Sequence, residues 1–203
     1  MIPNFEKYKS VICLDGQLPI EFLKTVSLPI LAADGAANTL LKNGVTPTAI
    51  IGDLDSVDLR FANESVVVKV HDQDYTDFEK VLSYAEHQKL SPSIITGISG
   101  GYLDRIFMNL SIFSQTYSLF YSPDLIAFSK TEDFSLKLQC DTKISLFGAP
   151  KCEVTTRGLK WNLNNSELIF GGFSSCSNRT VETHIDFKVL GRIVTFVYLK
   201  PMH

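Results

Sequence analysis

The chain has 203 residues, enough for one domain or two small ones. Its 45% hydrophobic content argues against disorder, and its net charge of -3 argues against the basic surface that nucleic-acid binding requires. It has no apolar run of membrane-spanning length and no basic amphipathic stretch, and the polar, charged segment Met1–Ser10 does not resemble a signal peptide. Its four scattered cysteines form no Cys-x-x-Cys pair, so we expect buried, reduced thiols in a cytoplasmic protein.

The first half alternates short apolar runs with helix-like segments. Apolar residues repeat at helical spacing after Thr76, which makes a capping box with Glu79, and again after Gly101. Strands alternating with helices predict an α/β domain with a mostly parallel sheet over residues 1–122. Five β-branched runs bounded by Gly, Asp or Pro are the expected buried strands: Ser10–Leu14, Pro29–Ala33, Ala49–Gly52, Val66–Val70 and Ser93–Gly97.

The second half, residues 123–203, contains strand-like runs without a helical period between them. Several alternate apolar and polar residues, as a sheet with one solvated face does. Val189–Arg192 is expected to form a hairpin turn between the last two strands. We therefore predict an all-β, sandwich-like domain. Its expected strands are Leu125–Phe128, Phe134–Leu138, Lys143–Phe147, Cys152–Thr156, Glu167–Phe170, Ile185–Val189 and Ile193–Leu199.

Acidic residues follow successive strands of the expected parallel sheet. Any single one is explained by an ordinary turn or helix cap, but their recurrence at the carboxyl ends of the strands indicates a site. Crowded carboxylates repel one another unless a cation neutralises them, and Mg²⁺ prefers hard oxygen ligands. The acids are Asp34, Asp53, Asp55, Asp72, Asp74, Asp77 and Asp104.

Two of these acidic segments allow more than one interpretation. If residues 53–55 are extended, Asp53 and Asp55 face the same way and can address one ion; the alternative is a polar turn with a helix cap. Asp77 could equally complement the dipole of the helix it begins. We expect Lys80 to pair with Asp77 or solvent, and a phosphate contact is the alternative.

No Walker-type phosphate loop and no protein-kinase glycine loop is present. The segment Gly97–Gly101 joins an expected strand to an expected helix, and its glycines would let backbone N–H groups approach an anion. It is the candidate phosphate loop. Together with the acids it predicts Mg²⁺-dependent phosphate transfer from a nucleotide to a small molecule.

These motifs, in this order, resemble those of the thiamine pyrophosphokinase family. The resemblance covers nearly the whole chain, and the family's order of an α/β domain followed by a β domain matches the order expected from the residue patterns. The motifs are Ala33-Asp34-Gly35-Ala36-Ala37-Asn38, Gly52-Asp53-Leu54-Asp55-Ser56, Asp72-Gln73-Asp74-Tyr75-Thr76-Asp77-Phe78-Glu79-Lys80, Gly100-Gly101-Tyr102-Leu103-Asp104-Arg105 and Ser177-Asn178.

The resemblance implies transfer of the pyrophosphoryl group of ATP to the hydroxyl of thiamine, giving thiamine diphosphate and AMP. It implies Mg²⁺ on Asp53, Asp55 and Asp77, and it leaves open whether Asp53 or Asp77 accepts the hydroxyl proton. Ser177 and Asn178 would face thiamine, in a homodimer whose active site lies between the α/β domain of one subunit and the β domain of the other. The implied nucleotide and phosphate contacts are Asp34, Asn38, Gln73, Thr76, Gly101 and Asp104, to which we add Arg105.

The chain departs from the family pattern at three places. Tyr102 replaces an arginine and Arg105 replaces a histidine; since i and i+3 share a helical face, Arg105 can supply the lost guanidinium. The alternative is an Arg105 that contacts only solvent. Ala36 replaces a glycine, which is tolerated only if its φ is negative.

Trp161, the single tryptophan, is expected to be buried between sheets, with stacking on a thiamine ring as the alternative.

Two rival functions remain. Residues Asp53–Val57 resemble the nucleophile motif of haloacid-dehalogenase-like phosphatases, in which Asp53 would be phosphorylated. That interpretation leaves residues 72–80 unexplained. A non-catalytic thiamine- or nucleotide-binding module is the other rival, suggested by the changes at Tyr102 and Arg105.

Overall fold

The structure is a computed structural model that describes residues 5–55, 57 and 65–200. Ser56, which belongs to the second acidic motif, lies outside the described residues. The chain divides into two compact units. The α/β unit contains residues 5–113 and 120–122, and the β unit contains residues 114–119 and 123–200.

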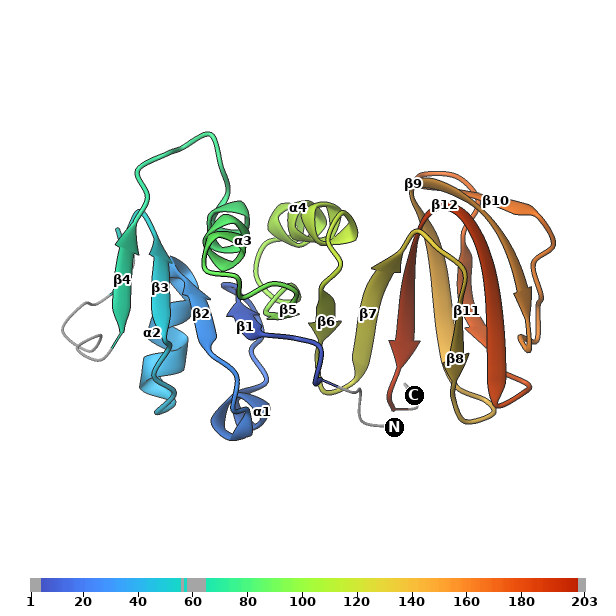
Figure 1. Ribbon diagram of the computed structural model, residues 1–203, viewed down its shortest axis with the longest axis horizontal. Coiled ribbons are helices and arrows are strands. Elements are labelled where there is room, and N and C mark those ends of the chain that lie inside the picture. Colours follow the sequence, from blue (N-terminus) through green and yellow to red (C-terminus); the bar gives the residue numbers. More distant parts are fainter. Residues whose placement is uncertain (1–4, 56, 58–64, 201–203) are drawn as a thin grey trace. The chain divides into compact units, whose positions relative to one another are not determined.

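The α/β unit is a parallel sheet connected through helices (Figure 1). Its strands are β1 (Ser10–Cys13), β2 (Ile30–Ala33), β3 (Ala49–Gly52), β4 (Val66–Lys69) and β5 (Ser93–Thr96), in the order β5-β1-β2-β3-β4, with β6 (Leu119–Tyr121) beside β5. All five expected strands are therefore confirmed. The helices are α1 (Ile20–Thr25), α2 (Asp34–Lys42), α3 (Asp77–His87) and α4 (Leu103–Ser114).

Two elements of this unit are less buried than the sequence pattern predicts. Strand β4 is at the end of the strand order, and Val66 is 57% exposed, so the expectation of a buried strand is wrong there. Helix α4 has the expected apolar spacing, but Phe113 is its buried residue whereas Leu103 is 80% exposed. Strand β4 is exposed because a strand at the end of the order is not covered on both sides. Helix α4 is exposed because its own unit covers only part of its apolar surface.

The β unit is antiparallel and contains two strands that are much longer than expected. Gly191 adopts a φ of 101° inside β12, and a bulge separates it from Ile193, so the expected hairpin at Val189–Arg192 is wrong. The glycine bends one continuous strand and does not reverse the chain. Strand β9 is likewise one continuous strand where two were expected, Lys143–Phe147 and Cys152–Thr156. The strands are β7 (Leu125–Lys130), β8 (Phe134–Lys137), β9 (Lys143–Arg157), β10 (Ser166–Ile169), β11 (Ser175–Arg179) and β12 (His184–Tyr198).

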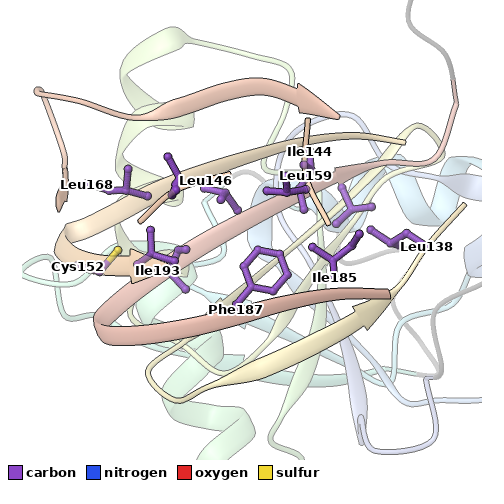
Figure 2. Close-up of a cluster of buried hydrophobic side chains, with 12 residues drawn as sticks. Leu138, Ile144, Leu146, Cys152, Leu159, Leu168, Ile185, Phe187 and Ile193 are labelled. Carbon is purple, nitrogen blue, oxygen red and sulfur yellow. The ribbon is translucent and has the colours of Figure 1, made fainter. Parts of the chain in front are cut away.

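The bent strands β9 and β12 pair along most of their lengths and contribute to both layers of the unit. One layer is β11, the first half of β9, the second half of β12 and β7; the other is β10, the second half of β9, the first half of β12 and β8. Their apolar side chains form one buried cluster, which includes Ile144, Leu146, Leu168 and Phe187 (Figure 2). The predicted order of the domains, an α/β domain followed by a strand-rich domain, is thus confirmed.

The cysteines only partly follow the expectation of burial. Cys13 and Cys152 are buried, but Cys140 and Cys176 are exposed, so the expectation is wrong for half of the thiols; all four are unpaired with one another. Across the described ranges, none of the helices has the length and apolar character needed to cross a membrane.

Candidate active site

Acidic side chains meet at the carboxyl edge of the parallel sheet. Asp15 follows β1, and Asp34 begins α2 immediately after β2. Asp53 and Asp55 follow β3. Because β1, β2 and β3 pair in parallel, their carboxyl ends share one edge, and the acids that follow them are brought together.

Three of these carboxylates form a compact cluster. Asp34, Asp53 and Asp55 each have an oxygen atom within 4.8 Å of the others. Leu54 has a φ of 66°, so of the two alternatives for Asp53–Asp55 the chain adopts a turn and not an extended segment, and the two carboxylates still lie close together. Three hard, anionic oxygen donors fit Mg²⁺, and a cation would relieve their mutual repulsion. The donor set is suited to the expected metal.

Glycines make room for these acids. A Cβ atom on Gly52 would lie 2.5 Å from the Cβ of Asp34, and one on Gly35 would lie 2.7 Å from the carboxyl carbon of Asp15. Either contact would displace an acidic side chain from the edge of the sheet. Ala36, the departure from the family's second glycine, lies in helix α2 with negative φ, which is the condition under which its methyl group is tolerated.

The loop after β4 delivers a second group of polar side chains. Thr76 caps α3 through the expected capping box with Glu79, and Asp77 is the first residue of the helix. The ammonium of Lys80 lies 3.4 Å from Oδ1 of Asp77, which confirms the expected pair, and the Lys80 side chain is only 4% exposed. A lysine buried to this degree needs a nearby anion, and the acidic cluster supplies that environment.

Asp53 connects the two groups. Nε2 of Gln73 donates a hydrogen bond to Oδ2 of Asp53 at 3.3 Å, and this bond is the main reason that the pKa of Asp53 lies below its usual value. Desolvation acts in the opposite direction, while the backbone of Asp55, the Asp34 side chain and the charge of Lys80 lower the pKa further. Asp53 is therefore held in its anionic form.

A cavity of about 260 Å³ opens beside Asp53. Of the expected site residues, Asp53, Gln73, Thr76, Asp77 and Arg105 line it. Asp34 and Asp55 adjoin it through the carboxylate cluster with Asp53. Within the described part of the chain, Asn38, Gly101 and Asp104 are not in the lining. The remaining lining residues are Leu14, Asp15, Ala33, Tyr75, Phe78, Lys80, Met108 and Asn109.

Arg105 is oriented by two contacts and is not free in solvent. Its guanidinium lies 3.5 Å from Oδ2 of Asp15 and 5.7 Å from the centre of the Tyr102 ring. The alternative of an Arg105 that contacts only solvent is therefore wrong. The adjoining loop has positive φ at Gly97, Gly100 and Gly101, a conformation that glycine adopts without strain.

In the β unit, the two residues expected to face thiamine differ sharply. Ser177 is exposed with a φ of 56°, and its N–H donates to Oγ of Ser145. Asn178 is 1% exposed, and its amide bonds the backbone of Trp161. Trp161 is 55% exposed, so the expectation of burial between sheets is wrong. A tight turn after β9 directs the ring outward.

The expected set missed several residues that the structure adds to the site. Asp15 directly follows the first expected strand, so the rule that identified the other acids would have found it. The burial of Lys80 had no sequence signal, because an i, i+3 ion pair is usually solvated. Met108 and Asn109 lie on α4, and nothing in the helical pattern distinguished them from its other residues.

Comparison with known proteins identifies the family. Residues 21–121 match the family model "Thiamin pyrophosphokinase, catalytic domain", and residues 132–193 match "Thiamin pyrophosphokinase, vitamin B1 binding domain". Thiamine pyrophosphokinase 2 of Arabidopsis thaliana is 30% identical over 189 residues, which cover 75% of this chain and 71% of that protein. The chain belongs to the thiamin pyrophosphokinase family. The phosphatase and the non-catalytic alternatives are accordingly not favoured.

Solved structures of this family have the same fold. Thiamine pyrophosphokinase from Bacillus subtilis aligns with a TM-score of 0.77 at 20% identity, covering 94% of this chain and 99% of that one. Yeast thiamin pyrophosphokinase aligns with a TM-score of 0.78 at 19% identity, covering 97% and 87%. The two-part architecture of the family is therefore retained in this chain although most residues have changed.

Proposed function

We propose that this protein transfers the pyrophosphoryl group of ATP to the hydroxyl of thiamine, giving thiamine diphosphate and AMP. The observation that carries the proposal is the carboxylate cluster of Asp34, Asp53 and Asp55 beside a polar cavity, in a chain that matches both domains of the family. Pyrophosphoryl transfer needs little covalent assistance from protein, so positioning and charge stabilisation provide most of the rate. Residues 1–122 would form the catalytic domain and residues 123–203 the thiamine-binding domain.

The proposed magnesium ligands are Asp53, Asp55 and Asp77. Asp34, which the resemblance places among the nucleotide contacts, is added to these ligands because its carboxylate adjoins those of Asp53 and Asp55. Asp77 lines the same cavity as Asp53. The depressed pKa of Asp53 keeps a ligand oxygen anionic, as cation binding requires. Bound Mg²⁺ would neutralise charge on the transferring phosphates. Lys80 would hold the Asp77 carboxylate in place through their 3.4 Å contact.

The proposed nucleotide and phosphate contacts surround this set. Arg105 lines the cavity and carries a guanidinium that binds phosphate oxygens bidentately. Gln73 and Thr76 line the same cavity, although the Thr76 hydroxyl is also engaged in the capping box. Three further residues remain in the proposal from the family motifs: Asn38, Gly101 and Asp104.

We also propose a cytoplasmic homodimer in which the α/β domain of one subunit and the β domain of the other share each active site. The exposed apolar side chains of α4, including Leu103 and Phe107, support burial against another surface. Ser177 would face thiamine, and Asn178 would contribute from beneath the same surface. This arrangement would place the acidic cavity and the thiamine-binding residues of different subunits together.

The reaction is tested by incubating the protein with ATP, Mg²⁺ and thiamine and separating the nucleotides. AMP and thiamine diphosphate in equal amounts are expected. ADP as the product would mean transfer of a single phosphoryl group and would overturn the proposal. Release of inorganic phosphate together with a phosphorylated Asp53 would instead identify a phosphatase.

The shared site is tested by mixing subunits. Asp55→Asn and Asn178→Ala proteins are assayed at thiamine concentrations well below the KM, where each is expected to be weakly active alone. Part of the activity should return once their subunits exchange, because a hybrid contains one intact site. Light scattering should report a dimer before mixing. Absence of recovery after mass spectrometry has verified the exchange would argue for sites within single subunits.

A further inference from the structure

We infer that Asn178 is a positioning residue that presents the ring of Trp161 to the flat, cationic substrate, and is not itself a ligand of that substrate. The inference rests on the proposed thiamine function and assigns a physical role within it. It follows from how the Asn178 amide is used and from where the Trp161 ring lies.

The hydrogen-bonding capacity of the Asn178 side chain is fully used inside the β unit. A carboxamide has two N–H donors and an oxygen that accepts two hydrogen bonds. Nδ2 donates to the carbonyl of Trp161 at 2.7 Å and to Oγ of Ser175 at 3.1 Å. Oδ1 accepts from the backbone N–H groups of Trp161 at 3.2 Å and Arg179 at 2.8 Å. The side chain is also 1% exposed, so a substrate would have neither access to it nor a free hydrogen-bonding group on it.

The same bonds fix the turn that carries Trp161. Both the N–H and the C=O of Trp161 are held by Asn178. The preceding residue, Lys160, donates its N–H to the carbonyl of Arg179 at 2.8 Å, and the N–H of Leu159 is held by Oδ1 of Asn162 at 3.0 Å. Three consecutive backbone N–H groups are thus bonded, and those of Lys160 and Trp161 bind residues of β11, which fixes this turn against the strand.

The Trp161 ring lies outside this fixed backbone. The residue is 55% exposed, and the ammonium of Lys160 lies 4.7 Å from the ring centre. The lysine occupies one face of the indole through a cation–π contact. A large aromatic side chain on a rigid backbone loses little conformational freedom when a flat molecule stacks on it. Both residues lie within the region that matches the vitamin B1 binding domain, residues 132–193. A flat heteroaromatic ring suits this surface.

A double-mutant cycle separates positioning from direct contact. Trp161→Ala and Asn178→Ala are each expected to raise the KM for thiamine about tenfold and to leave the KM for ATP within about twofold. If Asn178 acts through Trp161, adding Asn178→Ala to Trp161→Ala raises the KM no further. If Asn178 bonds thiamine itself, the two effects multiply to about a hundredfold, and the inference is overturned.

The single tryptophan provides a readout that does not depend on turnover. Thiamine is expected to quench Trp161 fluorescence in the wild type. Asn178→Asp keeps the shape and both acceptor positions but loses the two donors, so it should lower the fluorescence anisotropy of Trp161 and weaken quenching by thiamine. Asn164→Ala, an exposed asparagine close to the same turn, is the control and should change neither.

The outcomes also separate this inference from the proposed function. If the wild type forms no AMP and thiamine leaves its fluorescence unchanged, the proposed function is wrong. If AMP forms but Asn178→Asp has normal anisotropy and a normal KM for thiamine, the function stands and the positioning role is wrong. Should Asn178→Ala not fold, Asn178→Asp replaces it in the cycle, with Trp161→Ala and the pair of changes compared in the same way.

Discussion

The α/β unit and the β unit present their candidate functional side chains in opposite ways. In the α/β unit, acids stand in loops after the strands, and Asp53 and Asp77 line a cavity directly. In the β unit, Asn178 is buried and fully hydrogen bonded, and its influence passes through the backbone of Trp161. Binding a cation requires accessible charge, whereas presenting a flat ring surface requires rigidity behind it. A residue of a functional motif can therefore act through a neighbouring side chain without touching the ligand.

The largest expected effect tests how the β unit maintains that rigidity. Phe187 is fully buried and stacks on Phe134 with ring centres 4.4 Å apart. Phe187→Ala should lower the free energy of unfolding by about 3–5 kcal/mol, because it removes a large ring from a packed core. Phe187→Leu, which keeps most of the volume, should cost less than about 1.5 kcal/mol. Both are measured by denaturant unfolding; equal costs for the two variants would mean that the ring is not tightly packed.

The next effect is catalytic and belongs to the α/β unit. Asp53→Asn keeps the size of the side chain but removes a charge from the carboxylate cluster, so AMP formation should fall by at least about a hundredfold while the fold is retained. Affinity for Mn²⁺, followed by electron paramagnetic resonance, should fall with it. Glu86→Gln, which removes the charge of an exposed acid in the last turn of α3, is the matched control. Near-normal turnover of Asp53→Asn at saturating Mg²⁺ would refute the metal assignment.

The two units also differ in how far the sequence predicts them. Parallel strands end at a common edge, so the positions of Asp34, Asp53 and Asp55 after successive strands were enough to predict their proximity. The left-handed turn at Leu54 that completes the cluster was not predictable, because leucine carries no preference for positive φ. In the β unit no comparable rule applies. Gly191 and Arg192 between two apolar runs look the same in sequence whether the chain turns or continues through a bulge.

Arg105 tests the point where this chain departs from the family pattern. Arg105→Ala should raise the KM for ATP about tenfold, as expected when a charge-assisted phosphate contact is lost, and leave the KM for thiamine nearly unchanged. Its ion pair with Asp15 is more than half exposed on both sides, so stability should hardly change. Tyr102→Arg on this background should restore part of the affinity, and Arg105→Lys should be intermediate. If Arg105→Ala leaves the KM for ATP unaltered, Arg105 does not compensate for the arginine that Tyr102 replaces.

The smallest effect concerns the thiols, of which one is buried in the α/β unit and another in the β unit, while two more in the β unit are exposed. Burial raises the pKa of Cys13 to about 12 and that of Cys152 to about 11, so both are almost entirely protonated at pH 8 and also shielded from reagents. Since the thiolate is the reactive form, a disulfide reagent such as DTNB should label Cys140 and Cys176 quickly in the native protein. Cys13 and Cys152 should react only after denaturation. Raising the pH to 9 should leave Cys13 and Cys152 protected, because their pKa values remain well above that pH. Labelling of Cys152 in native protein at the rate of Cys176 would show that the β unit opens far more readily than its packed core implies, and would weaken the argument that its rigidity positions Trp161.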